Sequence, residues 1–180
     1  MPPHSTGLSH EDLAACQVLL KQGSKSFYAA SRLLPRGVRD WATVLYAFCR
    51  VADDRIDDGV DDHGVEELTL RVRGVYTKSS WDDPVDRALA VVVREASLPE
   101  SVFHLMIEGF SWDREGKVYE EISDTVAYSV RVASTVGVLM AAIMGVRDRE
   151  NLGRASDLGI AMQLTNIARD VGEDGRNQRV

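Results

Sequence analysis

Two segments of the chain each follow an apolar, helix-forming run with acidic residues four positions apart. Asp53 and Asp57 close one run, and Asp170 and Asp174 close another near the end of the chain. Residues four apart lie on one face of an α-helix, about 6 Å apart along its axis. The two carboxylates of each pair therefore share a face, and their mutual repulsion is costly beside an apolar cavity unless a cation joins them.

Magnesium is the cation that suits such pairs, with Mn²⁺ as a substitute. It prefers oxygen ligands and is usually held by one or two carboxylates together with the phosphates of a substrate. Two facing pairs could therefore clamp a diphosphate through bridging metal ions and neutralise it as it leaves. A single acidic helix end is more often a solvated surface, but the recurrence of the pattern favours the metal site. Residues 53–62 do not fit the ligand order of a calcium-binding EF-hand loop.

Other polar side chains share the helical faces of the two acidic pairs. They precede the acids at helical spacing and make two similar polar ladders, with Tyr46 and Arg50 on the first helix and Gln163, Asn166 and the flanking Arg169 on the second.

Composition limits the classes of protein to which the chain can belong. Its 180 residues, 44% of them hydrophobic, suffice for one domain spanning 1–180 with its own core. The formal net charge of −7 argues against a nucleic-acid partner, because phosphate backbones select basic surfaces. Cys16 and Cys49 lack metal-ligand spacing, so we expect reduced thiols rather than a disulfide, in a cytoplasmic protein.

The sequence contains no segment that we expect to be a leader or a membrane span. The first residues lack a basic and apolar signal pattern. The longest uninterrupted apolar stretch, 136–146, is shorter than the roughly 20 residues that a spanning helix needs. Peripheral association with a membrane stays open, as does the oligomeric state.

The pattern of apolar residues predicts an all-α protein. Apolar side chains recur every three or four positions, and strand and hairpin signals are missing. Caps and breakers place helices at about 9–22, 24–34, 38–58, 63–78, 84–97, 99–114, 122–146 and 148–174. No linker long enough to divide domains separates them.

Four motifs, taken together and in order, resemble the squalene/phytoene synthase family, and most closely its bacterial phytoene synthases. They are Ser24-Lys-Ser-Phe27 with Leu34-Pro35, Tyr46-Ala-Phe-Cys-Arg50-Val-Ala-Asp-Asp-Arg-Ile-Asp57, Tyr128 ahead of Val132-Ala-Ser-Thr-Val-Gly137, and Gln163-Leu-Thr-Asn-Ile-Ala-Arg-Asp-Val-Gly-Glu-Asp174. The first acidic motif also fits chain-elongating prenyltransferases and terpene cyclases, whereas the second resembles the head-to-head enzymes alone. The resemblance implies the isoprenoid synthase fold, with helices around a central apolar cavity.

The resemblance also implies roles for individual residues. Asp53, Asp57, Asp170 and Asp174 match the acids that hold Mg²⁺ against two prenyl diphosphates. The side chains expected to contact substrate are Ser24, Lys25, Ser26, Phe27, Tyr46, Arg50, Gln163, Asn166 and Arg169. Tyr128 matches a tyrosine near the reacting carbons. Two alternatives stay open, namely that Ser24 is a helix N-cap and that Tyr128 is a core tyrosine with a hydrogen-bonded hydroxyl.

The implied reaction is a head-to-head condensation. Loss of diphosphate leaves an allylic carbocation, the double bond of the second substrate attacks it, and proton loss closes a cyclopropane. A second ionisation then opens the ring and joins the chains. Phe27, Tyr46 and Tyr128 are candidates for electron-rich walls of a dry cavity, or for ordinary core residues.

The resemblance favours the condensation of two geranylgeranyl diphosphates to phytoene. This reaction belongs to carotenoid biosynthesis and needs no NADPH. Squalene or dehydrosqualene synthesis from farnesyl diphosphate is the alternative, and a non-catalytic assembly protein of the same fold is a second one. Small residues at Gly137, Ala141 and Gly145 fit either room for prenyl tails or close helix packing.

The chain stops at Val180, where members of the family continue into further helices. We therefore expect a C-terminally truncated domain that exposes apolar helix faces and has weak or no activity by itself.

Overall fold

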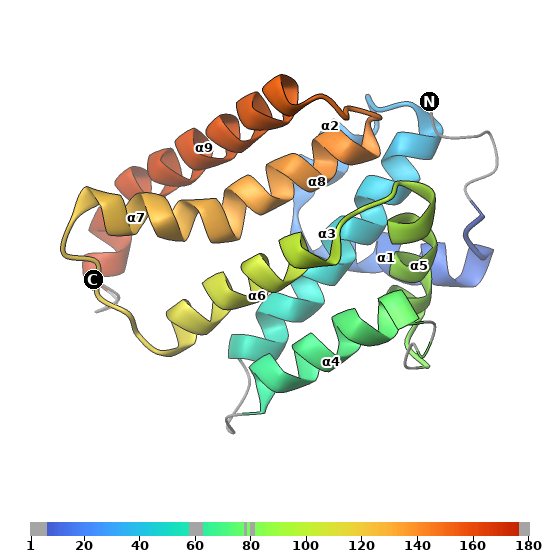
Figure 1. Cartoon of the computed structure of the whole chain (residues 1–180), viewed down its shortest axis with the longest axis horizontal. Helices are drawn as coiled ribbons and strands as arrows, with labels where there is room; N and C mark the ends of the chain where they lie inside the picture. The colour runs from blue at the N-terminus through green and yellow to red at the C-terminus, as the bar shows by residue number, and fades with distance from the viewer. Residues whose placement is uncertain (1–6, 58–62, 78, 80–81, 177–180) are drawn as a thin grey trace.

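The computed structural model describes residues 7–57, 63–77, 79 and 82–176, except for the side chains of residue 57 and residues 172–176. Every element within these ranges is a helix, as predicted (Figure 1). The helices are α1 (His10–Gly23), α2 (Lys25–Ser31), α3 (Arg36–Asp57), α4 (Gly64–Thr77), α5 (Pro84–Glu95), α6 (Glu100–Arg114), α7 (Ile122–Ser129), the π-helical turn η1 (Val130–Ser134), α8 (Thr135–Ile143) and α9 (Arg149–Arg176).

Local capping explains where several helices begin. The Ser9 hydroxyl accepts the backbone N–H of Asp12 at 3.0 Å and opens α1. Asp83 accepts the N–H of Val85 at 2.8 Å and opens α5, whose first residue is Pro84. The predicted helix ends at Asp58 and residue 78 lie outside the described residues.

The helix predicted over 122–146 runs without a break over Ile122–Ile143, but it is not α-helical throughout. It contains the π-helical turn η1, in which the Thr135 N–H bonds to the carbonyl of Val130, five residues back. The Arg131 carbonyl instead accepts the Thr135 hydroxyl at 2.5 Å. The helix ends at Ile143 because Gly145 adopts φ +92°, the left-handed conformation common just after helices.

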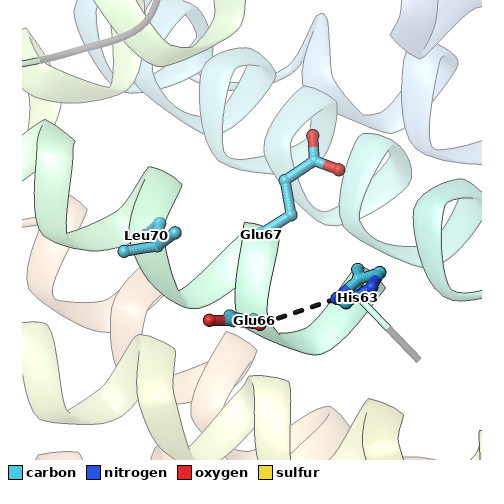
Figure 2. Close-up of a pocket in the computed structure, with 4 residues that line it drawn as sticks. All are labelled: His63, Glu66, Glu67 and Leu70. Carbon is cyan, nitrogen blue, oxygen red and sulfur yellow. Dashed lines mark ion pairs between the residues drawn. The ribbon is translucent and has the colours of Figure 1, made fainter. Parts of the chain in front are cut away.

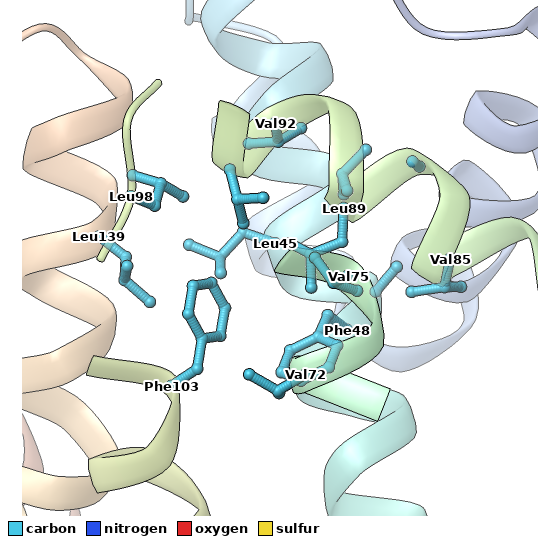
Figure 3. Packing of buried hydrophobic residues seen from close by; sticks show 14 of the residues in the cluster. Leu45, Phe48, Val72, Val75, Val85, Leu89, Val92, Leu98, Phe103 and Leu139 are labelled. Atoms are coloured by element: carbon cyan, nitrogen blue, oxygen red, sulfur yellow. The ribbon is translucent and has the colours of Figure 1, made fainter. Parts of the chain in front are cut away.

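The core forms around α3, which crosses the middle of the molecule. α3 packs against α1, α4, α5, α6 and α8. Figure 3 shows apolar side chains from α3, α4, α5, α6 and α8 that meet there. Phe48 and Phe103 are fully buried and meet edge to face with ring centroids 5.5 Å apart. Burying each of these rings contributes about 1.5–3 kcal/mol of stability.

A buried ion pair joins α4 and α5. Arg71 donates to both carboxylate oxygens of Asp86, with its Nε 2.9 Å from Oδ2 and Nη2 2.8 Å from Oδ1. Both residues are almost completely buried, and burial raises the pKa of Asp86 against the opposing effect of Arg71. This carboxylate lies outside the predicted acidic pairs and has a structural role.

α9 lies alongside α8 and η1 at very short range (Figure 1). A Cβ on Gly137 would come within 2.6 Å of the Ala155 carbonyl oxygen, and one on Gly159 within 2.7 Å of the Ala133 carbonyl oxygen. The hydroxyls of Ser134 and Ser156 are also 2.5 Å apart. Close helix packing is therefore the role of Gly137, whereas Gly145 lies beyond the helix and is not part of a helical stripe.

The segment Ile122–Ile143 is the one described stretch that is long and apolar enough to cross a membrane, judged by length and composition alone. Its most apolar window has a mean hydropathy of 1.7. In the structure this segment packs against α6 and α9, and 39% of that window is buried. Large apolar side chains are exposed on α9 at Leu158, Met162 and Val171.

We predict that Gly137→Ala destabilises the fold, because the added methyl group must displace the backbone of α9. Urea unfolding should show a loss of about 1–3 kcal/mol. Gly153→Ala is the matched control on α9, where a Cβ meets nothing within 4 Å. It should be neutral or stabilising by up to about 1 kcal/mol. Equal effects of the two substitutions would contradict the close contact.

Candidate active site

The polar face of α3 borders a cavity that is open to solvent. The cavity measures about 230 Å³, and its lining consists of Tyr46, Cys49, Arg50 and Asp53 from α3, Phe110 from α6, Val132 from η1 and Val136 from α8. Its opposite wall is thus entirely apolar. The predicted ladder of Tyr46, Arg50 and Asp53 therefore lies on one side of an apolar cavity.

Charges on this ladder are partly compensated by arginine. Arg50 lies 3.5 Å from the Asp53 carboxylate and 2.5 Å from that of Asp54. All three side chains are between 43% and 50% exposed, so Arg50 and Asp53, which line the cavity, sit at its mouth and stay accessible to a ligand. Asp57 ends α3 one turn further on, but its side chain lies outside the described residues.

The motif at residues 24–27 meets the same ladder. The rings of Phe27 and Tyr46 stack with centroids 5.3 Å apart and planes 17° apart. The Ser24 hydroxyl accepts the N–H of Phe27 at 3.1 Å, which confirms the N-cap alternative for this serine. It also lies 3.3 Å from the hydroxyl of Ser26, and the side chains of Ser26 and Lys25 are exposed. α2 thus places two hydroxyls and a cation near Tyr46.

Tyr128 is half-buried at the end of α7, and its hydroxyl donates to Asp113 on α6 at 2.8 Å. Its ring packs against Tyr119 with centroids 5.2 Å apart. Burial first, and then the charge of Asp113, raise the pKa of Tyr128 above its ordinary value, and the charge of Asp53 adds to the shift. Tyr128 is therefore a neutral phenol whose pKa is affected by Asp53 of α3. Its hydroxyl is hydrogen-bonded, as the alternative of a core tyrosine predicted.

Two residues on α6 that sequence reasoning missed contact the helix over 122–143, Gly109 at η1 and Asp113 at α7. A Cβ on Gly109 would lie 2.7 Å from the Arg131 Cβ and 2.8 Å from a Val132 methyl, so only glycine allows this approach. One turn further along α6, Asp113 meets Tyr128, which lies one turn before Val132. Nothing in the local sequence pairs residues 113 and 128, because the contact depends on the packing of separate helices.

The second ladder lies on α9. Gln163 and Asn166 are partly buried, and the exposed Arg169 makes a two-pronged ion pair with Asp170 at 2.6 and 2.7 Å. The hydrogen bonds from Arg169 lower the pKa of Asp170. Asp174 belongs to the same helix, but its side chain lies outside the described residues.

The structure places the two ladders on helices that both pack against α8, α3 on one side and α9 along its length. The described side chains include no cluster of three acidic, histidine or cysteine groups that could hold a metal ion. Because one acid of each pair is not described, joint metal binding stays a prediction.

A second hollow, of about 290 Å³, lies on the outer side of α4 (Figure 2). Its lining residues are His63, Glu66, Glu67 and Leu70, and His63 approaches Glu66 at 3.7 Å. The hollow is open, is formed by consecutive turns of one helix, and contains no member of either ladder. It is therefore a surface depression rather than the candidate site.

Comparison with known proteins agrees with these features. The family model for squalene/phytoene synthase matches residues 20–180. The chain is 48% identical over 177 residues to the phytoene synthase of Rhodobacter capsulatus, covering 96% of this chain and 52% of that protein. It is 47% identical to the phytoene synthase of Cereibacter sphaeroides, again covering 96% of this chain and 52% of the relative. The chain thus spans about half the length of the curated relatives it matches.

Solved structures confirm the predicted fold. A crystal structure of a dehydrosqualene synthase with a ligand matches with a TM-score of 0.86 at 36% identity, over 94% of this chain and 60% of that one. The squalene synthase of Alicyclobacillus acidocaldarius matches with a TM-score of 0.88 at 26% identity, over 94% and 65% of the two chains. On the strength of its fold, its motifs and the match of the family model, the chain belongs to the squalene/phytoene synthase family.

Proposed function

We propose that this chain carries the first part of a magnesium-dependent phytoene synthase, which condenses two geranylgeranyl diphosphates head to head through prephytoene diphosphate. The observation that carries the proposal is the placement of Arg50 and Asp53 at the mouth of an apolar cavity. The similarity to phytoene synthases over 96% of the chain supports this product class.

The acids of both ladders would hold the metal. Their carboxylates are hard oxygen ligands, those of Asp53 and Asp170 are partly exposed, and a diphosphate would supply further oxygens. Magnesium bound there would supply the positive charge that stabilises the departing diphosphate. The donor set of the chain thus fits the ion, with Asp53 and Asp57 on one side and Asp170 and Asp174 on the other.

Several side chains near Tyr46 would bind the diphosphate itself. Arg50 offers planar N–H donors that match phosphate oxygens. The Ser24 hydroxyl uses its oxygen as a cap acceptor, so its O–H remains able to donate to a phosphate. Lys25 and Ser26 are exposed beside it and would complete this part of the site.

The apolar wall of the cavity would protect the carbocation from water. Phe110, Val132 and Val136 offer no group that could attack the cation. The stacked Phe27 and Tyr46 rings present π-faces nearby, which attract positive charge. The cavity of about 230 Å³ is smaller than the roughly 300–1,000 Å³ of typical small-molecule sites. We therefore expect the rest of the tunnel to be built by the part of the relatives that this chain does not span.

Two other functions are alternatives to this proposal. Structural similarity to a dehydrosqualene synthase and a squalene synthase keeps farnesyl diphosphate as an alternative substrate. A non-catalytic assembly protein is the other, but such a protein has no physical need for the repelling carboxylate pairs.

We predict phytoene formation by an extended protein, in which residues 1–180 continue into the C-terminal part of the Rhodobacter capsulatus phytoene synthase. With Mg²⁺ and geranylgeranyl diphosphate, solvent extraction should yield phytoene, equally with and without NADPH. Residues 1–180 alone should give little or no product. Product formed only from farnesyl diphosphate would favour the squalene or dehydrosqualene reaction, and no product from either substrate would favour the assembly protein.

We further predict that Asp53→Ala and Asp170→Ala each lower turnover of the extended protein by about a hundredfold or more, because a diphosphate would lose its metal-mediated contact. Circular dichroism should show unchanged helix content, since both side chains are partly exposed. Asp157→Ala is the matched control, an exposed acid on α9 outside the ladder. Wild-type rates in either ladder variant would refute the assigned roles.

A further inference from the structure

Asp113 stands out as a charged residue that contacts a predicted catalytic side chain but belongs to neither acidic ladder. It lies near the end of α6, and its carboxylate accepts the hydroxyl of Tyr128 at 2.8 Å. Its side chain is exposed, so burial does not oppose its negative charge. A charged acceptor makes this hydrogen bond stronger than one between neutral groups.

Packing around the pair fixes both partners. Trp112, next to Asp113, has the Lys117 ammonium 3.3 Å from its ring centroid and the Arg131 guanidinium carbon 4.0 Å from it. The Tyr119 ring lies against Tyr128, while the buried Tyr119 hydroxyl has no hydrogen-bond partner in the described part of the chain. Tyr119 therefore does not compete for Asp113.

The pair lies one helical turn from two residues that line the cavity. Phe110 and Val132 line the cavity, and Asp113 and Tyr128 lie one helical turn further along the same two helices. The charge of Asp53 also contributes to the raised pKa of Tyr128. The orientation of this phenol thus matters to a carbocation formed there.

We propose that Asp113 is a positioning residue that turns the O–H bond of Tyr128 toward itself, so that the phenol presents its oxygen lone pair and ring to the carbocation. The inference rests on the proposed function. With the hydroxyl hydrogen directed to Asp113, the negative end of the O–H dipole remains for the developing cation. Without Asp113 the hydroxyl can rotate and point its hydrogen into the cavity, which repels positive charge.

A double-mutant cycle tests the proposal in the extended protein. Asp113→Ala should lower kcat by about tenfold to a hundredfold, the value of one hydrogen bond to a charged group. Asp113→Asn should lose less, because its amide oxygen can still accept the hydroxyl. In a Tyr128→Phe background, Asp113→Ala should cause no further loss, because its effect passes through the Tyr128 hydroxyl.

The matched control is Glu115→Ala, an exposed acid two positions further on, which should leave kcat unchanged. An equal loss from Asp113→Ala in both backgrounds would overturn the proposal, since the effect would not pass through Tyr128.

A spectroscopic measurement separates this proposal from the proposed function. In residues 1–180 labelled with ¹³Cζ-tyrosine, Tyr128→Phe identifies the Tyr128 signal, and Asp113→Ala should shift that signal as the hydrogen bond is lost. An unmoved signal would overturn the assignment of Asp113 whatever the turnover. Absence of turnover in the unmutated extended protein would instead refute the proposed function.

Discussion

The placement of the second acidic helix depends on a contact between backbones. Gly137 and Gly159 let α9 approach α8 and η1 so closely that a Cβ at either position would lie within 2.7 Å of a carbonyl oxygen. Within the described residues, α9 packs mainly against α7, η1 and α8. The close approach at the two glycines therefore fixes the position of α9 along its neighbours and the direction in which its polar ladder faces. A similar approach at Gly109 sets α6 against η1. Glycines thus position the helices that carry the functional groups.

This arrangement gives the inner helix of residues 122–143 two roles. One side supplies Val132 and Val136 to the apolar wall facing the α3 ladder, while another holds α9 and its acids. The π-helical turn lies between the part that carries Tyr128 and the part that carries Val136, and Thr135 satisfies a carbonyl that the turn releases. Such turns are frequent at functional sites. The helix over 122–143 therefore contacts the helix that carries the second acidic ladder, carries Tyr128, and supplies apolar side chains to the cavity.

Much of this fold could be predicted from the sequence, because apolar spacing and helix-start signals such as the Ser9 cap and Pro84 act locally. The placement of Arg50 and Asp53 on the face of α3 that borders the cavity also followed from helical spacing. The π-helical turn could not be predicted, because one inserted residue leaves the run of apolar side chains intact. The pairing of Asp113 with Tyr128 could not be predicted either, since it arises where Gly109 lets distant segments meet. Joint metal binding by the four acids is still a prediction.

Equilibrium binding of farnesyl thiodiphosphate, which resists ionisation, tests the central claim most directly, because it needs no turnover. Isothermal titration calorimetry of the extended protein should detect binding with Mg²⁺ and lose it when EDTA replaces the metal. Removing a carboxylate from either α3 or α9 should weaken binding, because both ladders would share the metal-bound diphosphate. Binding that is equally tight without metal, or that depends on the acids of one helix alone, would contradict a site shared between the two acidic helix ends.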